Sequence, residues 1–134
     1  MTKPRRQLRA TLTNSGASSL VTLVIRNHSE VDAFLTSYNL PSEDGVLENG
    51  VFEFGDNRPR FLGRLAKRGL VQETDCIRLG PGAEYQATVD IARWYALSPG
   101  QYEVAYLAFH DFPPTLEATA LRSNQQSIQI GGAP

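Results

Sequence analysis

Few residues of this 134-residue chain are of types that carry out chemistry. The two histidines, His28 and His110, fall in predicted loops, and neither belongs to a His-Glu-x-x-His pattern, which would place two zinc ligands on one helical face. His28 lies two residues before Glu30 and His110 precedes Asp111, so a metal site would require two loops to meet. We expect solvated loop histidines, no metal and no cofactor.

Nucleophilic chemistry has equally little support. Cys76, the single cysteine, excludes an internal disulfide, and no histidine lies close to it to activate the thiol. We expect it to be a small buried residue in a strand. The sequence contains no Gly-x-Ser-x-Gly elbow, and no Gly-rich loop precedes a helix. It therefore predicts a protein that is not an enzyme.

Acidic residues gather in the predicted connection Pro41–Gly50. Glu43, Asp44 and Glu48 lack the alternating spacing of a calcium-binding loop, so we expect an exposed, solvated loop.

Basic residues form two clusters that allow two interpretations. They either protect sheet edges from pairing with neighbours or form a patch for an acidic partner. Nucleic-acid binding is disfavoured, because only Phe61 among the aromatic residues lies inside the second cluster to stack on bases. The first cluster is Lys3, Arg5, Arg6 and Arg9, and the second is Arg58, Arg60, Arg64, Lys67 and Arg68.

The charge and hydropathy of the whole chain give few further hints. The formal net charge is −1, so no strong field directs the molecule to nucleic acid or membrane. The apolar runs are too short to span a bilayer, and Met1–Arg6 lacks the apolar segment of a secretion signal. We expect a cytoplasmic protein, or a secreted or periplasmic one if a leader has been removed.

The chain is organised around the stretch from Leu79 to Tyr106. Gly80-Pro81-Gly82 has the composition of a type II turn, and alternating apolar residues from Tyr85 to Ile91 predict an antiparallel strand. Asp90–Tyr95 predicts a capped corner, and a Gly-x-Tyr-x-Val strand opens after Pro99.

The remaining segments predict further short strands. We expect an edge strand from Leu8, a central strand over Leu20–Asn27, and short strands elsewhere. Phe52 and Phe54 predict a strand whose return is Arg60–Leu62. The other expected strands are Ala33–Tyr38, Cys76–Leu79 and Ser127–Ile130. The sum is one all-β domain over residues 1–134, an immunoglobulin-like antiparallel β-sandwich of about 7 to 9 strands.

An ordered series of motifs resembles a known family. It consists of Phe61–Gly69, Thr74-Asp75, Leu79–Gly82, Val89–Ile91, Tyr95–Leu97, Gly100–Tyr106 and Leu121–Asn124 followed by alternating Ile128 and Ile130, with Tyr38-Asn39-x-Pro41 ahead of it. The series is similar to the N-terminal, non-catalytic β-sandwich region of deuterolysin-type (aspzincin) zinc metalloendopeptidases. The catalytic domain of that family, with its His-Glu-x-x-His helix, is absent from these residues, so no zinc ligand carries over. The resemblance implies an immunoglobulin-like accessory or pro-region fold that restrains a peptidase or assists its folding.

Three functional hypotheses follow. The first is a non-enzymatic module that binds another protein, in its sharpest form a peptidase inhibitor, through the loops Pro41–Gly50, Gly63–Asp75 and His110–Ala118. The second is a structural protein that self-associates through sheet edges, and the third is an enzyme that binds a metal or a small molecule. For Lys67 and Arg68, the alternative is that their stems pack on the sheet and their charges are solvated. The candidate protein-binding residues are Arg64, Lys67, Arg68, Glu43, Asp44, His110 and Asp111.

Overall fold

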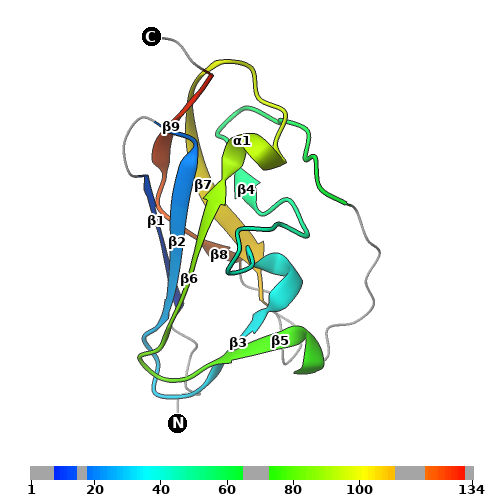
Figure 1. Cartoon of the computed structure of the whole chain (residues 1–134). Helices are drawn as coiled ribbons and strands as arrows, with labels where there is room; N and C mark the ends of the chain where they lie inside the picture. The colour runs from blue at the N-terminus through cyan, green and yellow to red at the C-terminus, as the bar shows by residue number, and fades with distance from the viewer. Residues whose placement is uncertain (1–7, 15–17, 65–72, 111–119, 132–134) are drawn as a thin grey trace.

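The computed structural model describes residues 8–14, 18–64, 73–110 and 120–131 (Figure 1). Within these residues the fold is mostly β, with nine antiparallel strands in three sheets and one four-residue helix. No helix of this part has the length and hydropathy needed to span a membrane. The strands are β1 (Leu8–Asn14), β2 (Leu20–Asn27), β3 (Ala33–Thr36), β4 (Phe52–Glu53), β5 (Cys76–Leu79), β6 (Glu84–Asp90), β7 (Gly100–Phe109), β8 (Ala120–Arg122) and β9 (Gln126–Ile130); the helix is α1 (Ile91–Trp94), and 3-10 turns span Ser37–Asn39 and Glu73–Asp75.

The first sheet has the order β1-β2-β6, and its three strands lie side by side in Figure 1. One row across it pairs Leu12 with Leu23 and Leu23 with Ala87, all buried. The next row pairs polar residues, and the hydroxyl oxygens of Thr22 and Thr88 lie 2.9 Å apart. The period of two therefore makes one face apolar and the other polar. The predictions that the first strand lies at an edge and the second in the centre are confirmed.

The long strand β7 organises a second sheet. It pairs with β9 through Gly100–Val104 and with β8 through Leu107–Phe109, while β4 pairs with it at Tyr106 and Ala105. The third sheet joins β3 to β5 at the lower end of Figure 1.

The core lies where these elements face one another. Its largest fully buried side chain is Tyr106, whose ring meets that of Phe52 edge-on at 5.9 Å between centroids. Fully burying an aliphatic or aromatic side chain of this kind contributes about 1.5–3 kcal/mol. The other large side chains with almost no exposure are Leu12, Leu23, Ile25, Leu35, Ile91 and Ile128.

The turns of the organising stretch form as predicted. The Ala83 N–H donates to the Gly80 carbonyl over 3.0 Å, and Gly82 has a φ of 75°, which a type II turn requires at its third position. At the corner, Asp90 accepts a hydrogen bond from the Ala92 N–H and caps α1, a contact that contributes about 1 kcal/mol.

Two expected elements differ in the structure, one strand was not expected, and one residue differs in its burial. The third strand ends at Thr36, because a 3-10 turn begins at Ser37. Residues 60–62 do not return along β4: Phe61 bridges Tyr95 instead and stacks on Trp94. Strand β8 was not expected at all, and Cys76, expected to be buried, is partly exposed in β5.

Tyr95, directly after α1, gives the fold a predicted sensitivity to alkali. Its hydroxyl accepts a hydrogen bond from the Phe52 N–H, and burial raises the pKa of Tyr95 to about 12. Because the unfolded tyrosine ionises near pH 10, stability is complete below that pH and falls as the pH rises from 10 to 12, by about 1.4 kcal/mol per pH unit. Burial also raises the pKa of Tyr106, which adds to the fall.

Urea unfolding between pH 8 and pH 12, followed together with tyrosinate absorbance, measures this loss. The Tyr95→Phe variant removes one of the three tyrosines whose pKa burial raises, so its stability should fall less steeply with pH. Equal slopes for the two proteins would contradict this assignment.

Candidate functional site

The candidate residues fall in separate places. Glu43 and Asp44 are exposed in the connection between β3 and β4, and Arg64 is exposed beyond β4. His110 follows the last residue of β7. Lys67, Arg68 and Asp111 lie outside the described residues, so their proposed roles stay predictions.

The expectation of a solvated loop histidine is wrong for His110, whereas His28 is exposed as expected. His110 is only 7% exposed, and its Nδ1 accepts a hydrogen bond of 2.9 Å from the Thr36 N–H. Because Nδ1 accepts, the neutral ring carries its proton on Nε2, which lies 2.8 Å from the Tyr106 hydroxyl oxygen and donates to it. His110 is therefore a buried member of a hydrogen-bond chain and is not available as a surface contact.

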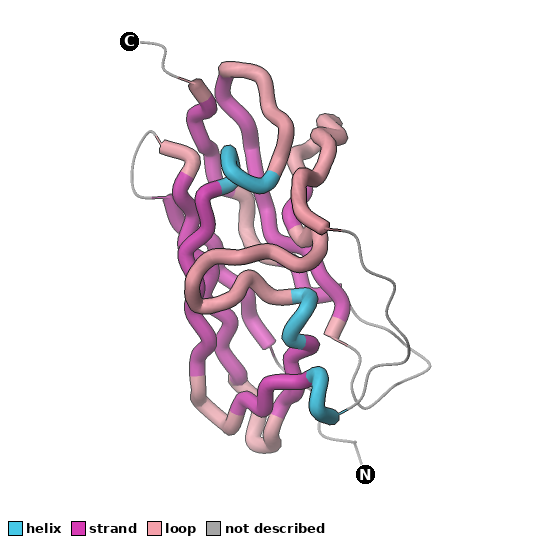
Figure 2. The backbone as a smooth tube through the Cα atoms, turned by 45° about the vertical axis from the view of Figure 1, so that its right-hand side comes forward, coloured by secondary structure: helices cyan, strands magenta, loops and turns pink. Residues whose placement is uncertain are grey.

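The same series of hydrogen bonds holds in place the connection that follows β3. The Tyr106 hydroxyl donates to the Asn39 carbonyl over 2.6 Å, and the Asn39 side-chain amide donates to the Phe109 carbonyl. Asn49 in turn donates to the Asn39 side-chain oxygen. The start of this connection is thus tied to β7 and Asn49, near its end, to Asn39, and Figure 2 shows the loop after the Ser37–Asn39 turn folding back across the strands.

Residues 42–46 of this connection form a closed turn, here called the acidic turn. The Ser42 N–H donates to the Val46 carbonyl, the Gly45 N–H donates to the Ser42 carbonyl, and the Val46 N–H donates to Ser42 Oγ, over 2.9, 2.8 and 3.0 Å. Serine suits this place because its hydroxyl accepts a hydrogen bond from the turn backbone. Three hydrogen bonds within five residues therefore make the turn well defined before any partner binds.

The acidic turn lies against the outer edge of β6. Gly45 has a φ of 78°, and a Cβ there would collide with the Thr88 carbonyl oxygen, so only glycine permits this approach. The Tyr85 hydroxyl donates to the Pro41 carbonyl over 2.6 Å and anchors the start of the turn. Burial raises the pKa of Tyr85, and the carboxylate of Glu43 raises it further.

The tip of the acidic turn exposes two carboxylates and one apolar side chain. Glu43 and Asp44 are exposed, and Val46 is 46% exposed. Among the described residues neither carboxylate makes an ion pair. Such a tip can contact a partner that offers a cation beside an apolar pocket, without first breaking an internal contact.

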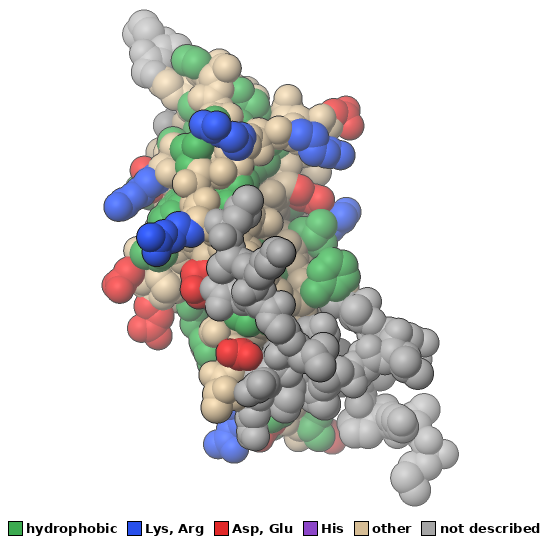
Figure 3. All heavy atoms as spheres, turned by 90° about the vertical axis from the view of Figure 1, so that its right-hand side faces the viewer, with side chains coloured by type: hydrophobic (Ala, Val, Ile, Leu, Met, Phe, Trp, Pro, Cys, Tyr) green, Lys and Arg blue, Asp and Glu red, His purple; other side chains and the backbone are tan. Residues whose placement is uncertain are grey.

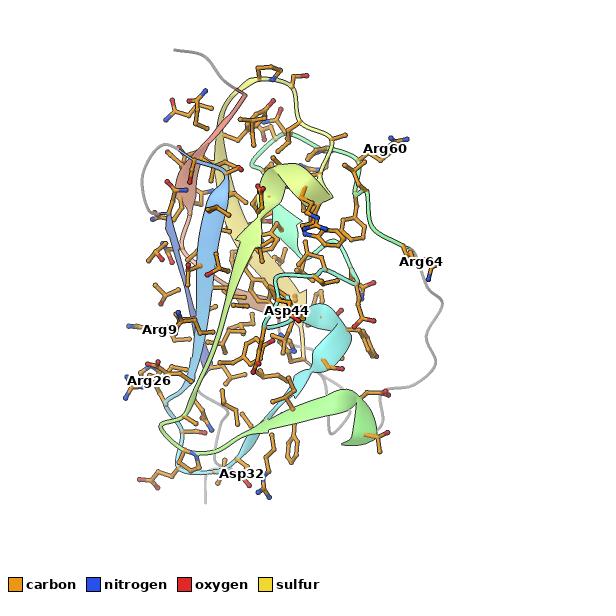
Figure 4. All side chains as sticks on the ribbon, in the orientation of Figure 1. Arg9, Arg26, Asp32, Asp44, Arg60 and Arg64 are labelled. Carbon is orange, nitrogen blue, oxygen red and sulfur yellow. The ribbon has the colours of Figure 1, made fainter. Side chains whose placement is uncertain are left out.

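The described basic residues of the second cluster do not join the acidic turn. Arg58 donates to the carbonyls of Gly55 and Asn57 in its own loop, whereas Arg60 and Arg64 are exposed. Figure 4 places these last two at the right-hand margin, apart from Asp44. Figure 3 shows basic and acidic side chains interspersed over the described part of that side of the molecule, so no large field of one sign covers it.

Two further observations bear on the site. No three His, Cys, Asp or Glu side chains come together as metal ligands within the described ranges. Comparison with models of known protein families and with curated protein sequences finds no match. The residues that build the turn, Ser42 and Gly45, were not singled out from the sequence, although Ser-x-x-Gly is itself a turn signal.

Proposed function

We propose that this chain is a non-enzymatic protein-binding module of immunoglobulin-like architecture and that its partner is a peptidase. The proposal is supported by one feature of the fold, one feature of the surface and the resemblance of the motif series to the N-terminal region of deuterolysin-type zinc endopeptidases. The surface feature, the acidic turn, carries most of the weight.

The supporting feature of the fold is a tyrosine corner. The Tyr102 hydroxyl donates to the Ser98 carbonyl four residues upstream over 2.9 Å, and the fully buried Val104 follows two residues later. Immunoglobulin-like sandwiches place a tyrosine in this way at the start of the strand that follows the corner. The short capped helix α1 lies at the same corner.

The supporting feature of the surface is the rigidity of the acidic turn. Loops carried by a rigid sandwich are common binding surfaces, and a preformed loop loses less conformational entropy on binding. The turn has its own hydrogen bonds, rests on β6 through Gly45, and presents Glu43 and Asp44 without an ion pair among the described residues. A peptidase surface with basic residues beside its cleft would suit these carboxylates.

The decisive experiment is an inhibition titration. We expect the protein to inhibit a deuterolysin-type zinc endopeptidase in one-to-one proportion, with cleavage of an unfolded protein substrate as the measurement. The double variant E43K/D44K should raise the inhibition constant about tenfold or more, because it reverses both charges at the contact. The variant R64A/K67A/R68A tests the basic residues in the same titration and should weaken inhibition without unfolding the domain.

The matched control is E30K/D56K, which reverses two exposed carboxylates in other loops and should inhibit like the unaltered protein. Full peptidase activity at a molar excess of the protein would contradict a peptidase partner. Undiminished inhibition by E43K/D44K would contradict the acidic turn as the contact.

A further inference from the structure

The first sheet has one edge that the described chain leaves largely open, that of β1. The N–H and C=O groups of Leu12 both bond the side-chain amide of Asn124, over 2.8 and 2.9 Å. These two groups therefore point away from β2. Alternation along an antiparallel strand directs the backbone groups of Leu8 and Ala10 the same way. The backbone of Asn27, which is paired with Leu8, supports this direction. Its N–H and C=O bond Ala83 and Gly82, on the side away from β1, so they do not bond Leu8.

The two edges of this sheet differ in how much of each is covered by other parts of the described chain. The acidic turn lies against β6, with Gly45 at the Thr88 carbonyl. On the β1 side, Asn124 bonds the backbone groups of Leu12 alone. Within the described chain no hydrogen bond from outside the sheet reaches the backbone of Leu8 or Ala10. A groove of about 500 Å³ runs along this edge, lined by Leu8, Arg9, Ala10, Thr11, Arg122 and Asn124. The groove offers room beside the unpaired backbone groups.

The charges along this edge are uneven. Arg9 lies directly opposite Arg26 in the β1–β2 register, and Figure 4 shows the two close together at the left-hand margin. Arg26 is compensated by Glu84 at 3.2 Å, whereas exposed Arg9 has no ion pair among the described residues. Like charges directly opposite one another destabilise a strand pair. A carboxylate placed on the open side of Arg9 would offset that repulsion.

We propose that the edge of β1 binds an extended acidic segment of another protein by strand addition. The segment pairs its backbone with Leu8 and Ala10, as in other cases of β-augmentation. Cross-strand neighbours share a face, so a residue opposite Arg9 is acidic and its neighbours, beside Leu8 and Ala10, are apolar. Pairing stops at Leu12, whose backbone groups Asn124 already occupies. This surface is separate from the acidic turn, so the inference stands whether or not the peptidase proposal holds.

A second copy of this chain is a poorer occupant. Pairing two β1 strands would bring the Arg9 and Arg26 charges of both copies to one shared edge, and like charges at such an edge oppose association. The remaining cation of the groove, Arg122, is already paired with Glu53 at 3.3 Å, which leaves Arg9 as the charge that selects the partner.

The probe is a short labelled peptide in which valine and glutamate alternate, measured by fluorescence anisotropy at low salt. Arg9→Glu should weaken its binding about tenfold, while Arg60→Glu, the same change at an exposed arginine on the other side of the molecule, should leave it unchanged. A peptide of alternating valine and lysine should not bind.

Hydrogen exchange separates strand addition from simple charge attraction. On addition of the valine–glutamate peptide the Ala10 amide should exchange more slowly, whereas the Leu12 amide, already bonded to Asn124, should change little. Undiminished binding by Arg9→Glu, or an Ala10 amide that gains no protection, would overturn the proposal. So would a dimer in light scattering that the peptide does not dissociate, because a second copy would then occupy the edge.

Discussion

Replacing Asn27 with aspartate should lower the free energy of unfolding by about 3–5 kcal/mol. Asn27 is fully buried, and its side-chain nitrogen donates to the carbonyls of Val31 and Leu79 over 2.8 and 2.9 Å. Its side-chain oxygen accepts from both the N–H and the hydroxyl of Ser29. A carboxylate keeps the accepting half but turns a buried negative oxygen toward two carbonyl oxygens. The loss should be smaller at pH 4, where a protonated aspartate retains one donor.

The chain provides a matched control at its surface. Asn14 also donates from its side-chain nitrogen to two carbonyls, those of Ser18 and Leu20, but at a more exposed position. Asn14→Asp should therefore cost about 1 kcal/mol or less, because water replaces the lost partners. Urea unfolding at pH 7 measures the loss of unfolding free energy in both variants. Equal losses would show that the burial of Asn27 does not cause the effect of its replacement.

Replacing Tyr106 with phenylalanine should lower the free energy of unfolding by about 2–3 kcal/mol. The change keeps the ring in the core but removes the hydroxyl that links the His110 Nε2–H to the Asn39 carbonyl. One buried donor loses its acceptor, and the carbonyl loses the donor that holds the connection after β3. Thermal unfolding measures the loss.

Tyr102→Phe is the matched control for this second variant. It also removes one tyrosine hydroxyl bonded to a carbonyl, that of Ser98, but this contact is exposed. We expect a loss of about 1 kcal/mol or less. A Tyr106→Phe protein as stable as the Tyr102→Phe protein would contradict the role assigned to the buried chain.

Local patterns in the sequence predicted much of the fold. Alternation identifies the buried positions of β2 and β6, because the period of two is a property of the strand itself. Gly82 predicted a turn and Asp90 predicted a helix cap, because both features depend on contacts within a few residues. Glu43 and Asp44 were correctly expected to be exposed, since the surrounding composition is that of a loop.

Long-range packing decided the parts that the sequence did not predict. His110 is buried in a position where the N–H of Thr36, 74 residues earlier, donates to its ring, and the local sequence gives no sign of that contact. Phe61 leaves the expected hairpin because Trp94 and Tyr95 offer it an aromatic surface. Strand β8 has three residues and no alternation long enough to detect.

The contact between Asn124 and Leu12 also constrains the order in which the chain can assemble. The two residues are 112 apart in sequence, so this contact closes a very long loop and we expect it to form late in folding. During synthesis Leu12 leaves the ribosome 112 residues before Asn124. Throughout that interval the backbone of Leu12 has no amide to bond it, and the first strand offers an open edge to neighbouring nascent chains. We expect the charge of the arginine at position 9 to discourage basic nascent segments from pairing with this edge during that interval.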